Sequence, residues 1–276
     1  MMNLMDTELQ EKLKRLDAEL AAMDSAVIAF SGGVDSTFLA AEAYKVLGDK
    51  AQAFTVSSPT LPQSEIEDAK RFAAQIGIKH TIVTIDELAM PDFVRNDPER
   101  CYYCKKNRFS KLLDWAAEQG IAEVLDGGNL DDTKDYRPGM RALEELGRVR
   151  SPLLNNGFTK ADVRAAAKAA GLPVWDKPSS PCLATRVPYN HEITGDMLKR
   201  IEAGEAYLHR FFEGPVRVRV LETTARIEVP AGEFHRFGDD AFRAELCREF
   251  ERIGFDFISV DLQGFKSGNL NKQVAQ

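Results

Sequence analysis

The sequence predicts an α/β fold, a parallel doubly wound sheet followed by a smaller C-terminal α+β domain. Three observations support this class. Short apolar strands alternate with helical patterns through the first part of the chain, the periodicity is lost between 177 and 189, and an αββαβ order follows. Alternating strands and helices produce parallel strands with helices on both faces. We therefore expect two domains, 1–178 and 179–276.

Apolar runs and helical spacing locate the elements of the first domain. An opening helix, with leucines at positions 9, 13, 16 and 20, is expected to end near 23. Further strands are expected at 26–30, 51–56, 80–85 and 123–125, and helices at 63–76 and 109–119, with another helix running from the loop 31–36 through 47. Another helix is expected to begin at Thr159, with Asp162 as its capping partner.

The second domain follows a segment, 177–189, that contains three prolines and has no clear periodicity. Such a segment is typical of a linker or an active-site loop. Beyond it we expect helices at 196–210 and 239–253 and strands at 216–220, 225–229 and 255–262. The tail after Lys266 is expected to be frayed.

The composition of the 276-residue chain is that of a soluble globular protein, with 44% hydrophobic and 29% charged residues. Its 36 basic and 43 acidic residues give a net charge of −7, which disfavours a nucleic-acid partner because such proteins usually carry a basic face. The longest apolar runs are too short for a membrane span. The polar, acidic start shows no targeting segment, and we expect a cytoplasmic protein.

A serine- and glycine-rich hexapeptide, Ser-Gly-Gly-Val-Asp-Ser, joins the first strand to the next helix at 31–36. Backbone N–H groups and the helix dipole converge on an anion at such a junction, although a simple turn is the structural alternative. Neither a Walker loop nor a dinucleotide fingerprint is present. The hexapeptide resembles the pyrophosphate loop of the PP-loop ATP-pyrophosphatases, proteins of the adenine nucleotide alpha-hydrolase-like fold, which implies adenylation with release of pyrophosphate. We expect Asp35 and Ser36 to be catalytic and ATP to be bound by Ser31, Gly32, Gly33, Asp35 and Ser36.

A second polar segment, Asp-Gly-Gly-Asn at 126–129, follows the strand expected at 123–125. Open α/β folds bind ligands at the carboxyl ends of their strands. We therefore expect Gly128 and Asn129 to contact ATP. Asp131 and Asp132 come directly after and would hold Mg²⁺ through carboxylate oxygens, the alternative being two solvated loop acids.

Four cysteines in a chain without a secretory signal favour metal or sulfur chemistry over disulfides. Cys101 and Cys104 form a C-x-x-C pattern just before the helix expected at 109–119, which fits zinc, a redox pair or an iron–sulfur cluster. A structural zinc site usually needs four ligands, commonly from two such pairs, and the chain has one pair. Cys182 stands alone in the segment 177–189, and Cys247 is expected to be a small core residue.

Several separate motifs carry a closer family resemblance. They are Asp-Tyr-Arg-Pro-Gly at 135–139, Glu-Leu-Gly at 145–147, Arg-Ser-Pro-Leu at 150–153, Lys-Pro-Ser at 177–179 and Cys-Leu-Ala-Thr-Arg-Val-Pro-Tyr at 182–189. In these motifs the chain resembles the LarE family of ATP-dependent sulfur transferases, which build the nickel-pincer nucleotide of lactate racemase. The resemblance implies a substrate, pyridinium-3,5-biscarboxylic acid mononucleotide, whose carboxylates are adenylated and converted to thiocarboxylates.

The resemblance makes Cys182 the catalytic, sulfur-handling cysteine. In the sacrificial form of the family this cysteine gives up its own sulfur and becomes dehydroalanine, whereas in another branch three thiolates hold a [4Fe–4S] cluster that carries an extra sulfide. A cluster-bound sulfide is replaceable, whereas a cysteine sulfur is spent once. The presence of three cysteines, Cys101, Cys104 and Cys182, therefore favours the cluster-bearing branch. The alternative is that Cys101 and Cys104 bind zinc or no metal. The expected cofactors are ATP, Mg²⁺ and the [4Fe–4S] cluster.

Two arginines, Arg217 and Arg219, alternate along the strand expected at 216–220 and so share one face. Paired guanidiniums suit a phosphate, although an exposed antiparallel face is the alternative. The resemblance places the family's substrate-phosphate site at matching positions. It implies substrate binding by Arg186, Glu205, Arg217, Arg219 and Glu228.

Other functions remain open on the sequence alone. A tRNA thiolation enzyme combines such an ATP loop with three cluster cysteines, but the acidic balance and the motif at 135–139 oppose it. An ammonia-dependent amide-forming ligase would leave the three cysteines idle, and a regulatory module would bind ATP without releasing pyrophosphate. We expect a small nucleotide substrate, a sulfide donor and a homo-oligomer, and neither nucleic acid nor membrane as a partner.

Overall fold

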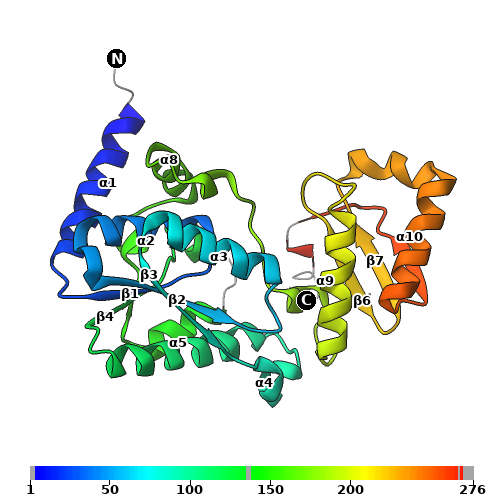
Figure 1. Ribbon diagram of the computed structural model, residues 1–276, viewed down its shortest axis with the longest axis horizontal. Helices are drawn as coiled ribbons and strands as arrows, with labels where there is room; N and C mark the ends of the chain where they lie inside the picture. The colour runs from blue at the N-terminus through cyan, green and yellow to red at the C-terminus, as the bar shows by residue number, and fades with distance from the viewer. Residues whose placement is uncertain (1–3, 135–137, 267, 270–276) are drawn as a thin grey trace. The chain divides into compact units, whose positions relative to one another are not determined.

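The computed structural model describes residues 4–134, 138–266 and 268–269, which form two compact units (Figure 1). Unit 1 comprises Met1–Ile85 and Cys101–Ser180, and unit 2 comprises Asp86–Arg100 and Pro181–Gln276. Residues 86–100 therefore belong with the C-terminal part of the chain, and the last crossing between units lies inside the segment 177–189. No helix among the described residues is long and apolar enough to cross a membrane.

Unit 1 is built on a five-stranded parallel sheet with the order β3-β2-β1-β4-β5. Its strands are β1 (Ala26–Ala29), β2 (Ala51–Ser57), β3 (Lys79–Thr84), β4 (Glu123–Leu125) and β5 (Val149–Arg150). Its helices are α1 (Leu4–Ala21), α2 (Val34–Leu47), α3 (Gln63–Ile76), α5 (Arg100–Glu118), α6 (Pro138–Leu146), α7 (Pro152–Asn155) and α8 (Lys160–Ala169). The predicted doubly wound α/β class is confirmed.

Both faces of this sheet are buried, which explains why its central strand is apolar throughout. Ala26 and Ile28 of β1 pack into a core with helices α1, α2, α3 and α8. Val27 points to the opposite face and packs with Phe54 and helix α5. Alternate residues of one strand thus serve two cores, as parallel sheets require.

The strand order brings the two predicted ligand loops together. From β1 the chain adds β2 and β3 on one side of the sheet and then returns to add β4 and β5 on the other side, so β1 and β4 are neighbours. Open α/β sheets bind ligands at such a switch in strand order. The loops that follow these strands approach closely, because a Cβ atom on Gly127 would lie 3.0 Å from the backbone nitrogen of Ser36. Only glycine fits at position 127 without a shift.

Two expectations for unit 1 were wrong. Helix α5 begins at Arg100 and not near 109, so Cys101 and Cys104 lie within its first two turns and not before it. The four consecutive polar residues from Lys105 to Arg108 interrupt the apolar spacing there and conceal the helical pattern. The short elements α6, β5 and α7 were not predicted, whereas the capping box of α8, formed by Thr159 and Asp162, is confirmed. Of the family motif at 135–139, Asp135, Tyr136 and Arg137 lie outside the described residues.

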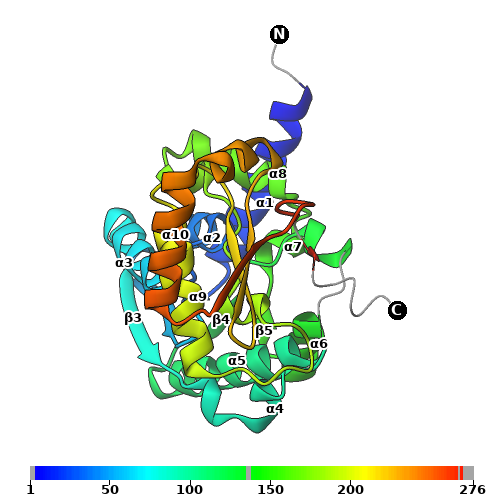
Figure 2. The same cartoon turned by 90° about the vertical axis from the view of Figure 1, so that its right-hand side faces the viewer.

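Unit 2 contains the predicted αββαβ block. Its elements are α4 (Pro91–Val94), α9 (Gly195–Leu208), β6 (Arg217–Leu221), β7 (Thr224–Glu228), α10 (Asp240–Ile253) and β8 (Phe257–Val260). The sheet order is β6-β7-β8, with β6 antiparallel and β8 parallel to β7. Helices α9 and α10 cover one face of this sheet (Figure 2), where Val218, Val220 and Ile227 are buried.

The segment 86–100 is held in unit 2 by the buried side chain of Asn96. Its amide nitrogen donates hydrogen bonds to the carbonyl oxygens of Pro188, at 2.7 Å, and His191, at 2.9 Å. Arg100 continues the contact by donating to the carbonyl of Ala184 at 3.0 Å. These bonds fix the stretch that follows Cys182 against the residues that precede Cys101.

Candidate active site

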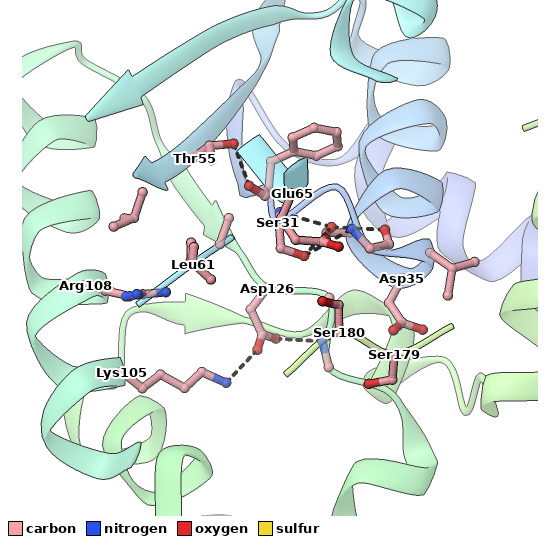
Figure 3. A pocket seen from close by; sticks show the side chains of 18 of the residues that line it. Ser31, Asp35, Thr55, Leu61, Glu65, Lys105, Arg108, Asp126, Ser179 and Ser180 are labelled. Carbon is pink, nitrogen blue, oxygen red and sulfur yellow. Dashed lines mark hydrogen bonds and ion pairs between the residues drawn. The ribbon is translucent and has the colours of Figure 1, made fainter. Parts of the chain in front are cut away.

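A cavity of about 410 Å³ opens in unit 1 at the carboxyl ends of β1, β2 and β4. Its walls include the loop 31–36, the segment 126–128 and residues of helix α5. Figure 3 shows Ser31 and Asp35 on one side of this space and Lys105, Arg108 and Asp126 on the other. The volume is within the range of small-ligand sites in proteins.

The loop 31–36 has the geometry of an anion cradle. The hydroxyls of Ser31 and Ser36 lie 3.1 Å apart, and the Ser36 hydroxyl donates to the carbonyl of Gly33 at 3.2 Å. Gly32 has a positive φ of 71°, and a Cβ atom there would lie 3.0 Å from the backbone of Ala69. Gly33 is the N-cap of α2 without a side-chain cap, so the first backbone N–H groups of this helix can meet a phosphate.

Asp35 is tied to the neighbouring loops by two side chains. Asn129 donates from its amide nitrogen to Asp35 Oδ1 at 3.2 Å, and the ammonium of Lys160 pairs with Asp35 Oδ2. Lys160 is the first residue of α8, and it was missed although its capping residue Thr159 was predicted. The structure therefore joins the loops after β1 and β4 to the start of α8.

The two aspartates expected to hold Mg²⁺ have different surroundings. Asp131 accepts a hydrogen bond from the backbone nitrogen of Lys160 at 2.8 Å and does not line the cavity. Asp132 lines the cavity and accepts from the backbone nitrogen of Asn129 at 3.0 Å. Asp35 also lines it, so the carboxylates of Asp35 and Asp132 offer the oxygen ligands that Mg²⁺ prefers.

Four basic side chains that line the cavity were not predicted as site residues from the sequence: Lys105, Arg108, Lys160 and Lys177, the last of which was noted only as part of a family motif. Lys177 lies in the predicted linker, where its ammonium bonds Asp68 at 2.7 Å and Glu65 at 2.9 Å on helix α3. Lys105 could have been found from the sequence, because it lies four residues after Cys101 and so on the same face of a helix. Together these cations suit a polyphosphate.

The cysteines fall in both units. Cys101 and Cys104 are half-buried on α5, three residues apart and so on one face of the helix, and Cys182 is half-buried in unit 2. Among the described residues no three histidine, cysteine, aspartate or glutamate side chains form a metal-binding group. The expectation for Cys247 was wrong, because this residue is exposed on α10.

Arg186 and Glu205 form a buried ion pair in unit 2. The guanidinium, 1% exposed, bonds both carboxylate oxygens at 2.9 and 2.7 Å. Its remaining nitrogen, Nη1, donates to the carbonyl oxygens of Pro181, at 2.6 Å, and Cys182, at 3.0 Å. Glu205 thus holds two nitrogens of Arg186, and the third nitrogen holds the segment around Cys182.

Arg219 on β6 and Glu228 on β7 form a second buried ion pair in unit 2. Their two hydrogen bonds measure 3.0 and 2.9 Å, and Arg219 also donates to the carbonyl of Thr185 at 2.6 Å. The alternative considered from the sequence, an exposed face of the antiparallel strand, does not hold for Arg219, because Arg219 is 8% exposed and Glu228 is fully buried.

Arg217 differs from both neighbours. It donates to the carbonyl of Val216 at 2.7 Å and stacks over Phe265 at 5.2 Å, and in the described part of the chain it has no carboxylate partner. Burial, and then the positive charge of Arg186, lower the pKa of Arg217 to about 10. A guanidinium in this position is ready to accept an anionic ligand.

Comparisons with known proteins agree with this geometry. The asparagine synthase family model matches residues 16–97, which include the loop 31–36. An uncharacterized protein of Synechocystis sp. is 44% identical over 268 residues, covering 97% of this chain and 100% of that protein. A tRNA-specific 2-thiouridylase of Geobacter metallireducens is 31% identical over 196 residues, which cover 56% of this chain and 53% of the thiouridylase.

A further relative matches over nearly its whole length. The pyridinium-3,5-bisthiocarboxylic acid mononucleotide synthase of Lactiplantibacillus plantarum is 38% identical over 270 residues, which cover 97% of this chain and 96% of that enzyme. This match, together with the anion cradle at 31–36, identifies the chain as a member of the LarE family of ATP-dependent sulfur transferases.

Proposed function

We propose that this enzyme converts pyridinium-3,5-biscarboxylic acid mononucleotide to its bisthiocarboxylic acid form. A substrate carboxylate oxygen attacks the α-phosphorus of ATP, and the bond to the bridging oxygen breaks as pyrophosphate leaves. A sulfide then attacks the acyl carbon, and the C–O bond breaks as AMP leaves. The observation that carries the proposal is the anion cradle at 31–36, in a chain similar over nearly its whole length to a pyridinium-3,5-bisthiocarboxylic acid mononucleotide synthase.

The residues of the nucleotide cavity have distinct parts in the first step. The N–H groups at the start of α2 and the hydroxyls of Ser31 and Ser36 would bind the departing pyrophosphate. Asp35 and Asp132 would hold Mg²⁺, and Lys160 would keep Asp35 in place. When bound, Mg²⁺ would neutralise phosphate charge.

The adenylation half of the proposal is tested by measuring AMP and pyrophosphate formed from ATP and the dicarboxylate nucleotide. Asp35→Ala should remove this activity, because it deletes a carboxylate in the cavity without opening the core. Asp49→Ala is the matched control, since Asp49 is exposed at the other end of α2. Equal activity of Asp35→Ala and Asp49→Ala would contradict the proposed site.

For the sulfur step, the donor set fits an iron–sulfur cluster. Cysteine thiolates, usually four, hold such clusters, and three of them would leave one iron free to carry sulfide. Cys101 and Cys104 project from one face of α5. The cluster would supply a replaceable sulfide, reloaded by a sulfide donor. The sacrificial alternative predicts that each chain loses about 34 Da, the mass of H₂S, from Cys182 by β-elimination. Intact-protein mass after turnover separates the two, because the cluster proposal requires an unchanged mass.

Arg217 is the residue we propose to bind the substrate phosphate. Losing a charge-assisted hydrogen bond typically costs about 1.5–3 kcal/mol, or about tenfold to a hundredfold in affinity. Arg217→Ala should therefore raise the KM for the nucleotide by that factor and leave ATP binding unchanged. An equal loss for ATP and nucleotide would contradict this assignment.

A further inference from the structure

A second cavity, of about 460 Å³, lies beside the nucleotide cavity within unit 1. The two share four lining residues: Lys105, Asp126, Gly128 and Asp132. Helix α6 and strand β5 form much of the rest of the wall, with Met140, Leu143 and Val149 among the apolar side chains. The lining therefore combines these apolar side chains with the polar wall shared with the nucleotide cavity, and Cys101, Glu144 and Ser151 add polar groups outside that wall.

The shared wall has a fixed charge arrangement centred on Asp126, which is 5% exposed. Asp126 accepts hydrogen bonds from the Ser151 hydroxyl at 2.5 Å and from the Gly128 backbone nitrogen at 3.2 Å. Its other oxygen, Oδ2, lies 3.3 Å from the ammonium of Lys105 (Figure 3). Because Asp126 is held by two further donors, it fixes the ammonium at the border of both cavities.

The position of Lys105 matters for the chemistry of adenylation. A carboxylate must approach the α-phosphate of ATP, and the two anions repel each other unless a cation lies between them. An ammonium in the wall common to the nucleotide cavity and its neighbour provides that cation. Cys101 lines the same second cavity, one turn before Lys105 on α5.

We propose that the second cavity binds the aromatic ring and the reacting carboxylate of the acceptor, with Lys105 between that carboxylate and the α-phosphate. This inference rests on the proposed function and assigns the acceptor class, a planar aromatic dicarboxylate, to a definite space. In that space the carboxylate oxygen forms its bond to the α-phosphorus, and pyrophosphate leaves with the electron pair of the broken bond. The acyl carbon then faces a cavity that contains a thiol of the chain.

The experiment measures binding of pyridine-3,5-dicarboxylate, the ring without its ribose phosphate, by equilibrium dialysis. The protein is loaded with an ATP analogue that has a methylene group between the α- and β-phosphorus atoms, so no reaction occurs. Met140→Trp should fill the second cavity and weaken probe binding at least tenfold while leaving affinity for the analogue unchanged. Arg141→Trp is the matched control, because Arg141 is exposed on the same helix and does not line the cavity.

Leu154→Phe, at another position that lines only the second cavity, replaces Met140→Trp if that variant does not fold. Absence of probe binding by the wild-type protein, or equal binding by the wild-type protein and the filled variants, would overturn the assignment. Failure of the proposed function looks different: the wild-type protein would release no pyrophosphate with the dicarboxylate nucleotide, while the effect of Met140→Trp on the probe would still support the cavity as an aromatic dicarboxylate site.

Discussion

Replacing Glu205 with Gln tests whether the pair formed with Arg186 is structural. The substitution keeps the shape of the side chain but removes the charge that faces a guanidinium only 1% exposed. Breaking a buried ion pair in this way costs about 3–5 kcal/mol, because one charge is left uncompensated away from water. The Val218 backbone nitrogen also donates to Glu205, at 3.0 Å, so strand β6 should lose stability directly.

Native-state hydrogen exchange of the β6 amides, read by mass spectrometry, measures this loss locally. A change of about 3–5 kcal/mol corresponds to roughly two to three and a half orders of magnitude in protection, up to the limit set by global unfolding. The double variant Arg186→Met/Glu205→Leu should recover only part of the lost protection. An apolar pair replaces the ions, but the Val218 N–H and the carbonyls of Pro181 and Cys182 lose their partners. A Glu205→Gln effect below about 1 kcal/mol would refute the reasoning.

Three further predictions concern other parts of the molecule. Burial, together with the charge of Lys70, lowers the pKa of His80 below 6.5, so the unfolded chain takes up a proton at higher pH than the folded chain does. The free energy of unfolding should therefore fall as the pH drops below about 6.5. Urea titrations of His80→Phe should show a smaller fall. Lys160→Met should weaken ATP binding about tenfold by calorimetry, because it removes the cation that holds Asp35, and Lys160→Arg should recover part of the loss. Cys104→Ala should lower bound iron and sulfur transfer together while pyrophosphate release persists, and the exposed Cys247→Ala should change none of these.

The sequence was sufficient for four of the five strands of the unit 1 sheet and for its first ligand loop, because the signals there are local. An apolar strand, a glycine-rich turn and a helical pattern identified β1, the loop 31–36 and α2. The capping box of α8 was equally local, since Thr159 and Asp162 are three residues apart.

Features that depend on distant contacts could not be predicted. The segment 86–100 belongs to unit 2 through Asn96, whose partners lie more than 90 residues along the chain. Lys177 was not assigned because its partners, Glu65 and Asp68, lie on α3. Helix α5 was shortened in the prediction because four consecutive polar residues mask its apolar face.

The arginines of unit 2 show why residue type alone does not identify a ligand contact. Arg186 and Arg219 each have a buried glutamate partner, and they donate to backbone carbonyls at Pro181, Cys182 and Thr185. In each arginine the nitrogen that does not bond the glutamate thus holds backbone carbonyls of the segment 181–185, which includes Cys182. Alanine at 186 or 219 would displace that segment, and the resulting loss of sulfur transfer would resemble a binding defect. Of these three arginines, only Arg217 has a guanidinium without a carboxylate partner among the described residues, so its replacement is the one that reports on a phosphate contact.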